Sequence, residues 1–224
     1  MNKVKIILLT ILTTAAMTIS SFAIEVKVGI SGGYSMIEAS GTETLKDTSG
    51  AVNHTEQAIA VIPSIFLEVG LDNGLAIGVD SVSGSADLAG SNRTRNLDTG
   101  GSGDDSGTNV ANAEVDGITT VYLIKQFKSG FLVKAGTASA DINTKETLSS
   151  GTAYGNKSVD GSMFGIGYQM ITDSGLFFRT TVENTDFDTI NLTGSQVGGT
   201  ASSFNKIKAD VDVTMAKFSI GKSF

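Results

Sequence analysis

The sequence predicts an all-β fold, an eight-stranded antiparallel up-and-down β-barrel that crosses a membrane. Three observations lead to this prediction. Apolar and polar residues alternate with a period of two along most of the chain, which indicates strands with two different faces. Short and long connections between these strands alternate strictly. Glycine accounts for 27 of the 224 residues, beside one proline and no cysteine, although hydrophobic residues make up 40% of the chain.

The first 23 residues have the features of a secretory signal peptide. Lys3 and Lys5 precede a short apolar stretch, and Ser21-Phe22-Ala23 places small residues at the positions that a signal peptidase reads. A retained membrane anchor is the alternative, but the apolar core is shorter than the ~20 residues of a spanning helix. We therefore expect export, with residues 24–224 forming a single barrel domain. Loss of the two lysines changes the formal net charge of −7 to −9.

Eight segments of the mature chain show strand-like alternation. Most of them are long enough to cross a bilayer, because a tilted membrane strand needs ~9–11 residues. The apolar face of the first segment, from Val26 to Met36, alternates with Lys, Gly and Ser. The segments are residues 25–36, 55–71, 75–80, 113–127, 131–142, 159–171, 176–187 and 206–224.

The connections between the segments indicate how the barrel sits in its membrane. Three are tight turns: Asp72-Asn73-Gly74, Lys128-Ser129-Gly130 and Asp173-Ser174-Gly175. Their glycines tolerate the positive φ of hairpin turns. In an up-and-down barrel every second connection lies at the same end, so all three tight turns share one end. Bacterial outer-membrane barrels have short periplasmic turns and long external loops. The four long connections, expected at the external end, are residues 39–54, 86–112, 143–158 and 188–205.

The polar face of the strands predicts a charged barrel interior. In a membrane barrel the apolar face contacts lipid and the other face lines the lumen, which in eight strands is only wide enough for side chains. Since unpaired buried charges are costly, we expect Glu68, Asp80 and Glu183 to pair with Arg179 and neighbouring lysines. Such a network would plug the lumen; a narrow polar conduit is the alternative. Inward glycines would make room for bulky side chains. The expected lumen charges are Lys27, Glu68, Asp80, Lys125, Lys134, Arg179, Glu183 and Lys217.

The last segment ends in a pattern that resembles a known assembly signal. Phe224 is preceded by alternating hydrophobic residues, among them Ile220 and Phe218. This is similar to the C-terminal signal that outer-membrane barrels present to the barrel-assembly machinery. Lys222 departs from the pattern, which usually has an aromatic or hydrophobic residue at that position.

Together these features resemble the small eight-stranded bacterial outer-membrane β-barrel proteins of the opacity-protein, OmpX and OmpA transmembrane-domain type. The resemblance covers the whole mature chain but is architectural, and no short motif identifies a subfamily. It implies location in the outer membrane of a Gram-negative cell and a structural, adhesive or narrow-porin role. The implied partners are outer-membrane lipid and lipopolysaccharide, the assembly machinery, and surface ligands bound through the long loops.

Composition argues against several other functions. The negative net charge disfavours nucleic-acid binding, and one histidine without cysteine offers little for a metal centre, so we expect no cofactor or metal and no enzymatic activity. Two alternatives remain open. A soluble secreted lipocalin-like barrel would turn its apolar face inward to bind a small apolar ligand. An outer-membrane lipid A acyltransferase would need His54 with Asp105-Ser106 as base, carboxylate and nucleophile.

Overall fold

The computed structural model describes residues 24–44, 51–71, 73–88, 93–97, 107–147, 151–197 and 205–224. The predicted signal segment, residues 1–23, lies outside them. None of the described residues is helical, and no helix among them is long and apolar enough to cross a membrane.

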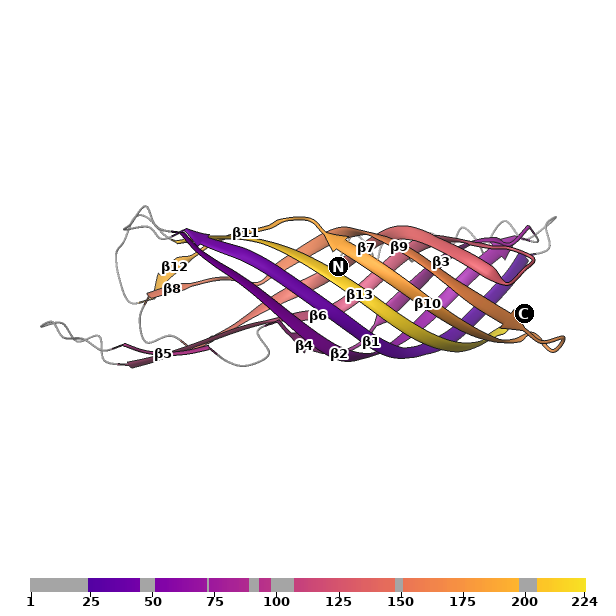
Figure 1. The fold of residues 1–224 in the computed structure, drawn as a ribbon, viewed down its shortest axis with the longest axis horizontal. Coiled ribbons are helices and arrows are strands. Elements are labelled where there is room, and N and C mark those ends of the chain that lie inside the picture. Colours follow the sequence, from indigo (N-terminus) through magenta and orange to yellow (C-terminus); the bar gives the residue numbers. More distant parts are fainter. Residues whose placement is uncertain are drawn as a thin grey trace, which may run out of the picture.

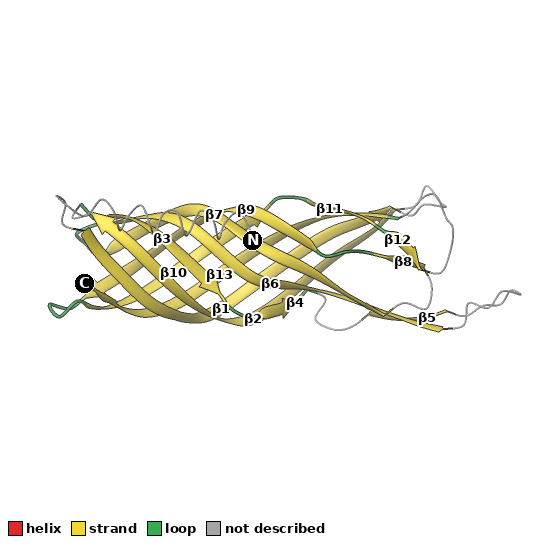
Figure 2. Cartoon of the chain, turned by 180° about the vertical axis from the view of Figure 1, so that it is seen from behind, coloured by secondary structure: helices red, strands yellow, loops and turns green. Residues whose placement is uncertain are grey.

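Eight long strands form one closed antiparallel sheet. Figures 1 and 2 show these strands tilted around a common axis. Each strand pairs with the next along the chain, in the order β1-β2-β3-β6-β7-β9-β10-β13, and β13 pairs with β1 to close the ring. This confirms the predicted up-and-down barrel. The strands are β1 (Ile24–Thr44), β2 (Ala51–Leu71), β3 (Leu75–Val82), β6 (Gly107–Gln126), β7 (Phe131–Thr147), β9 (Lys157–Ile171), β10 (Leu176–Phe187) and β13 (Lys206–Ser223).

The long connections contain more strand than the sequence predicted. β1 continues to Thr44 and β2 begins at Ala51, and the two remain paired throughout. Parts of the predicted long connections are therefore strand, because polar residues continue the ladders by backbone pairing. The shorter strands here are β4 (Ser85–Asp87) and β5 (Arg93–Leu97), both paired with β6; β11 (Ile190–Thr193), paired with β13; and β8 (Gly151–Ala153), paired with β12 (Ser195–Val197).

The tight turns lie at the opposite end of the barrel, as predicted. Gly74, Gly130 and Gly175 all have positive φ, between 78° and 90°. In the first turn the Asn73 side chain accepts a 2.9 Å hydrogen bond from the backbone N–H of Leu75. The strict separation of short turns from long connections is therefore a property of the fold.

The two faces of the strands differ as the alternation predicted. Outward apolar side chains form an exposed belt that includes Ile30, Tyr34, Ile59, Val61, Ile65, Phe164, Tyr168, Met170, Val182 and Phe218. The alternate residues of the same strands are mostly buried inside the barrel. An apolar exterior around a buried interior that contains charges is the arrangement of a barrel surrounded by lipid.

Several glycines provide space for aromatic rings inside the barrel. A methyl group added at Gly29 would lie 2.5 Å from the Phe66 ring, and one at Gly78 would lie 2.5 Å from the Tyr122 ring. Gly221 approaches the Phe177 ring in the same way, at 2.4 Å. Not every strand glycine lies inside: Gly32 shares the outward face of Ile30 and Tyr34, and no atom would lie within 4 Å of its added methyl group.

A β-bulge in β6 reverses the faces of this strand. The register with β7 shifts between Asp116 and Thr119, and the intervening Gly117 has a φ of +60°. Before the bulge the odd-numbered Val115 is buried, whereas beyond it the even-numbered Ile118 and the residues in phase with it are buried. An extra residue on one strand has this effect because side chains alternate with a period of two.

The bulge corrects the predicted position of Lys125. Uninterrupted alternation placed Lys125 in the lumen, but its neighbours Ile124 and Leu132 are the buried ones. Lys125 pairs across the sheet with the exposed Leu75, and its ammonium group donates to the carbonyl of Asn73 in the first tight turn. Lys125 is therefore not part of the lumen charge network.

Candidate functional site: a layered lumen and a fork in the barrel wall

The barrel interior has a charged layer towards the tight turns and an apolar layer towards the long connections. From the tight-turn end, the buried side chains of β2 are Glu68, Phe66, Ser64 and Ile62, and those of β10 are Phe177, Arg179, Thr181, Glu183, Thr185 and Phe187. We call the charged layer the plug and the apolar layer the apolar interior.

The first half of the plug is a bidentate ion pair between Arg179 and Glu68. The two guanidinium NH groups donate to the two carboxylate oxygens at 2.6 and 2.7 Å. The Tyr122 hydroxyl donates to the same carboxylate at 2.8 Å, and Arg179 Nε donates to Gln169 at 2.8 Å. The guanidinium carbon also lies 5.0 Å from the centre of the Phe66 ring. The planar fork of arginine suits such a bidentate contact.

The second half of the plug is a chain of four charges. The Glu183 carboxylate accepts from Lys134 at 2.6 Å and from Lys217 at 2.8 Å. Lys217 also donates to Asp80 Oδ2 at 2.8 Å. The Lys134 ammonium lies 3.9 Å from the centre of the Tyr122 ring, which joins the two halves of the plug.

The plug is electrically balanced. Arg179, Lys134 and Lys217 face Glu68, Asp80 and Glu183, and all six side chains are at least nine-tenths buried. Breaking such a buried pair leaves an uncompensated charge, which is strongly destabilising. Because side chains from β2, β3, β7, β10 and β13 meet here at hydrogen-bond distance, they occupy the centre of the lumen.

The remaining predicted residues lie outside the plug. Lys27 is buried near the tight-turn end and forms a 2.7 Å ion pair with Glu25, which also accepts from Ser223. Phe218, Ile220 and Phe224 of the expected assembly signal lie exposed at the end of β13 and beyond it. Tyr122, Gln169 and Thr181 in the plug were not predicted, because lumen residues were chosen by their formal charge. The alternation along each strand could have identified them, since they lie on the inward face.

The apolar interior fills the outer part of the barrel. The apolar interior was not predicted from the sequence, because the inward face was expected to contain only small, polar and charged residues. The larger buried members are Ile37, Ile62, Val82, Val115, Ile118, Ile142, Val159, Phe187, Ile190, Val211, Val213 and Met215. Among the described residues, this half of the lumen is therefore lined mainly by apolar side chains.

The barrel wall forks between β2 and β3. Their pairing ends at Ser64 and Val82, and the last backbone hydrogen bond between them runs from the Ser83 N–H to the Pro63 carbonyl at 3.0 Å. Beyond this point the chain pairs with β6 through β4. No described strand pairs with residues 51–62 of β2 on the edge away from β1. Pro63 lacks a backbone N–H, and Gly84, with a φ of +107°, turns the chain away. We call this place the fork.

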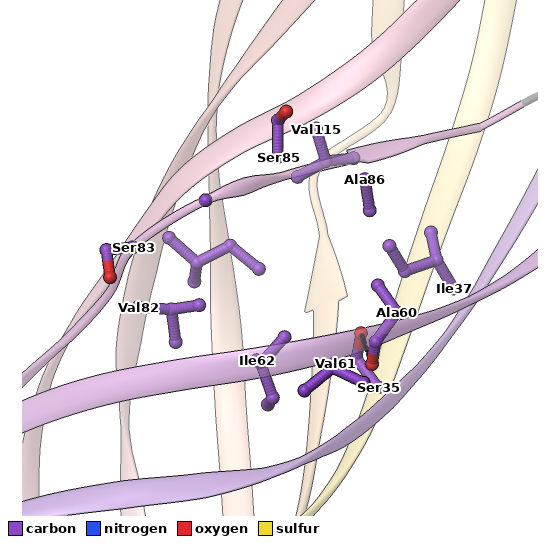
Figure 3. Close-up of a pocket in the computed structure, with 12 residues that line it drawn as sticks. Ser35, Ile37, Ala60, Val61, Ile62, Val82, Ser83, Ser85, Ala86 and Val115 are labelled. Atoms are coloured by element: carbon purple, nitrogen blue, oxygen red, sulfur yellow. Dashed lines mark hydrogen bonds between the residues drawn. The ribbon is translucent and has the colours of Figure 1, made fainter.

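A cavity of about 20 Å³ lies at the fork, next to the apolar interior. Figure 3 shows the side chains of β1, β2, β3, β4 and β6 that line it. Of two consecutive residues in its lining, Val61 is 71% exposed on the lipid-facing side and Ile62 is only 6% exposed. Residues from both faces of the barrel wall therefore line the cavity. Its lining residues are Ser35, Ile37, Ala60, Val61, Ile62, Val82, Ser83, Gly84, Ser85, Ala86, Val115 and Ile118.

At the outer rim, hydrogen bonds connect segments that are distant in sequence. Glu43 on β1 accepts from the Tyr154 hydroxyl at 2.7 Å and from the Asn205 amide at 2.9 Å. Burial and the donation to Glu43 raise the pKa of the Tyr154 phenol above its usual range. His54 is exposed on β2 opposite Gly41, whereas Asp105 and Ser106 of the acyltransferase alternative lie outside the described residues.

Comparisons with known proteins agree with this architecture. No protein-family model matches the sequence, and the curated proteins yield no match to it. Among solved structures, the outer membrane protein OprG from Pseudomonas aeruginosa is similar with a TM-score of 0.51 and 15% identity, over 92% of this chain and 98% of that one.

Two further structures are reported with lower scores. Neisserial surface protein A matches with a TM-score of 0.42 and 10% identity, over 92% of this chain and 100% of that one. Ail, the attachment invasion locus protein of Yersinia pestis, matches with a TM-score of 0.39 and 10% identity, over 89% and 99% of the two chains. The closed ring of eight strands and the likeness to OprG together show that this chain has the fold of the small outer-membrane β-barrel proteins.

Proposed function

We propose that this chain is a non-enzymatic integral outer-membrane protein that exchanges small apolar molecules between the bilayer and its apolar interior through the fork. The fork carries the proposal, since it is where β2 loses its partner beside a cavity lined by both the exposed Val61 and the buried Ile62. An unpaired stretch of barrel wall with apolar residues on both sides gives an apolar molecule a route that avoids water.

Location in the outer membrane is supported by three features. The exposed apolar belt would be costly in water but suits contact with lipid. Residues 1–23 resemble an export signal. The fold is that of outer-membrane proteins such as OprG. The belt also argues against the soluble lipocalin-like alternative, which would require a polar exterior.

The plug argues against a polar conduit. Its six charges neutralise one another, and the apolar interior lies directly in line with it. A hydrated ion would have to break buried ion pairs and then cross an apolar region, where its charge would be unpaired. The protein is therefore closed to hydrated solutes along its axis, and the fork offers the shorter path for apolar ones.

Uptake of a small hydrocarbon by Gram-negative host cells tests this function. Cells that express the full chain should take up radiolabelled benzene faster than cells with an empty vector, at equal outer-membrane integrity. Ala60→Phe adds a bulky ring at the fork, where Ala60 lines the cavity, and should return uptake to the vector level. Ile59→Phe is the matched control, because Ile59 is 77% exposed on the lipid-facing side and should leave uptake unchanged.

Two results would contradict the proposal. One is equal uptake with and without the protein in the outer membrane. The other is full uptake by Ala60→Phe while that variant is folded at normal levels. Recovery of the protein in a soluble fraction would overturn its assignment to the membrane.

We further propose partners that follow from this location. Outer-membrane lipid and lipopolysaccharide would surround the belt, and the assembly machinery would recognise the exposed Phe218, Ile220 and Phe224. Removal of Phe224 should then lower the amount of folded protein in the outer membrane, while refolding of the purified variant in detergent proceeds normally. Reduced refolding of the purified variant would show that Phe224 serves stability rather than recognition.

A further inference from the structure

The fork brings two unpaired strand edges to face each other, and the first of them belongs to β2. In a strand, the N–H and C=O of one residue point to the same edge, and successive residues alternate between the two edges. The Pro63 carbonyl accepts from the Ser83 N–H, so the odd-numbered residues of this part of β2 face away from β1. The backbone N–H and C=O of Val61 and Ile59 therefore point into the fork.

The second edge belongs to β4, on the opposite side of the fork. The Leu88 N–H, next to the end of β4, donates to the Ala113 carbonyl of β6 at 2.7 Å. The even-numbered residues of this segment therefore direct their backbone groups to β6. The alternation leaves the N–H and C=O of Ser85 and Asp87 directed towards β2.

The register of β2 and β3 shows which residues of the two edges correspond. Ser64 lies opposite Val82, and the same register continued outwards would place Val61 opposite Ser85. This pair does not form, since β2 and β4 are not paired. Val61 and Ser85 both line the cavity at the fork, as Figure 3 shows. Two backbone donors and two backbone acceptors thus border the same space.

Unpaired peptide groups are exceptional at this depth of a membrane barrel. Val61 belongs to the apolar belt, together with Ile59 and Ile65 on the same face of β2. Lipid chains offer no hydrogen-bond partner, so backbone groups at this level need one from the protein or from a bound molecule. The facing edges of β2 and β4 therefore favour an occupant that can form hydrogen bonds with both.

The two edges restrict the polar group of that occupant. A secondary amide in the trans form has its N–H and C=O pointing in opposite directions. It can donate to one edge and accept from the other, as the backbone of an added strand does in a sheet. An ester only accepts, and a charged group would be costly beside Ile62, Val82 and Ile118 of the lining. A neutral secondary amide fits best.

The fork has room for such a group. The cavity of about 20 Å³ exceeds the roughly 10–15 Å³ that a group of the size of water requires. From there the opening widens towards the outer rim, since β5 diverges from the beginning of β2 in both views (Figures 1 and 2). Paired strands lie about 4.8 Å apart, so an amide between two edges needs about twice that spacing, which a widening gap provides.

We propose that the facing edges of β2 and β4, at Val61 and Ser85, bind the amide group of a small apolar secondary amide. Its apolar substituents lie against the belt on one side and the apolar interior on the other. This site rests on the proposed function and refines it by naming the class of molecule that is exchanged.

Three probes of equal heavy-atom number test the site in the full mature chain, reconstituted in lipid nanodiscs. They are N-methylhexanamide, methyl hexanoate and nonane, and each affinity is corrected for partitioning into nanodiscs without protein. We expect the amide to bind most tightly, the ester about fivefold more weakly because it lacks a donor, and nonane more weakly still.

NMR of the backbone N–H groups locates the bound amide in the unaltered protein. The N–H signal of Val61 or of Ser85 should move downfield when the amide binds, because one of them donates to its carbonyl. The Ile65 N–H is the internal control, since Ile65 is paired with Ser81 in the ladder with β3. Its signal should stay in place.

Substitutions separate the backbone groups from the apolar surroundings. Val61→Pro/Ser85→Pro removes both N–H groups without breaking a ladder bond, because both point into the fork. It should weaken the amide about fivefold and leave nonane unchanged. Val61→Ala/Ser85→Ala is the matched control, which keeps both N–H groups and should alter neither affinity.

The outcomes distinguish this site from the proposed function. If none of the three probes binds, the proposed function fails and the site fails with it. If amide and nonane bind equally and the double proline variant alters neither, the site is wrong while apolar exchange stands. Unchanged Val61 and Ser85 signals at saturating amide also overturn the site, and this measurement decides the matter if the proline variant does not fold.

Discussion

At the scale of single residues, the ion pair of Arg179 and Glu68 shows how charges are accommodated inside the barrel. Neither side chain has access to water, and each satisfies the other through two hydrogen bonds. Stability therefore depends on keeping both groups or neither. Glu68→Met should lower the free energy of unfolding by about 3 kcal/mol or more, because Arg179 would remain buried without a counter-charge.

The double variant Glu68→Met/Arg179→Met should recover most of this loss, since no unpaired charge remains. Urea unfolding in lipid vesicles, followed by the migration of unboiled samples on gels, measures both variants. Equal destabilisation of the single and double variants would mean that the pair itself, rather than the avoided burial of one charge, stabilises the barrel.

The glycines give a second prediction at this scale. Gly78→Ala should cost about 1–3 kcal/mol, because the new methyl group would overlap the Tyr122 ring. Gly32→Ala should change stability by less than about 0.5 kcal/mol, since open space surrounds that position on the outer face. The same unfolding measurement compares them. A similar cost at both positions would show that backbone preference, rather than space inside the barrel, selects glycine here.

At the scale of elements, β2 has two parts with different surroundings. Residues 64–70 pair on both edges, whereas residues 51–62 pair only with β1 among the described strands. Alternate backbone N–H groups of residues 51–62 should therefore exchange with deuterium faster than those of residues 64–70. Hydrogen exchange followed by NMR in nanodiscs measures this difference. Uniform protection along β2 would show that the fork is closed in the folded protein.

The elements also show what the sequence could predict. The period of two identified the eight strands and the outward face, and turn glycines such as Gly74 located the tight turns, because both signals are local. The β6 bulge was not predicted, since one extra residue leaves the composition of a strand unchanged while exchanging its faces; Lys125 was misplaced for this reason. The fork was not predicted because it depends on which strand β4 pairs with, a contact between distant segments.

The charged residues of the plug could be predicted from the sequence, but its uncharged residues could not be predicted from charge. Arg179 and Glu183 were predicted to face the lumen because they alternate with apolar residues along their strand. Since a buried charge without a counter-charge is costly in free energy, we expected the lumen charges to pair. The apolar interior could not be separated from the belt by the same reasoning, because isoleucine and valine serve both surfaces. Only the bulge and the register establish that Val115 and Ile118 face inward together.

At the scale of the whole molecule, the closed ring predicts the behaviour of the intact protein in a membrane. The purified chain should insert into planar bilayers without ion conductance above background, because the plug and the apolar interior lie in series. Removing both members of a plug pair, in Glu68→Ala/Arg179→Ala, should leave conductance at background, because the apolar interior remains in series with the altered plug. Steady conductance through the unaltered protein would contradict the sealed lumen.

Fractionation gives a second prediction for the intact protein. The mature chain should be recovered in the outer membrane and should migrate faster on gels before boiling than after it, since closed barrels resist detergent until heated. A soluble protein whose migration does not depend on heating would favour the lipocalin-like alternative.

The bulge at Gly117 has a consequence for how this barrel tolerates change in length. Deleting this one residue would not simply shorten β6; it would invert the half of the strand that lies beyond it towards the outer rim. Val115 would then face outward, and Glu114, which now pairs with Lys145, would point into the apolar interior without that partner. This one residue thus determines which side chains of β6 face inward on either side of the bulge. Only insertions or deletions of an even number of residues would keep the inward and outward faces of both halves.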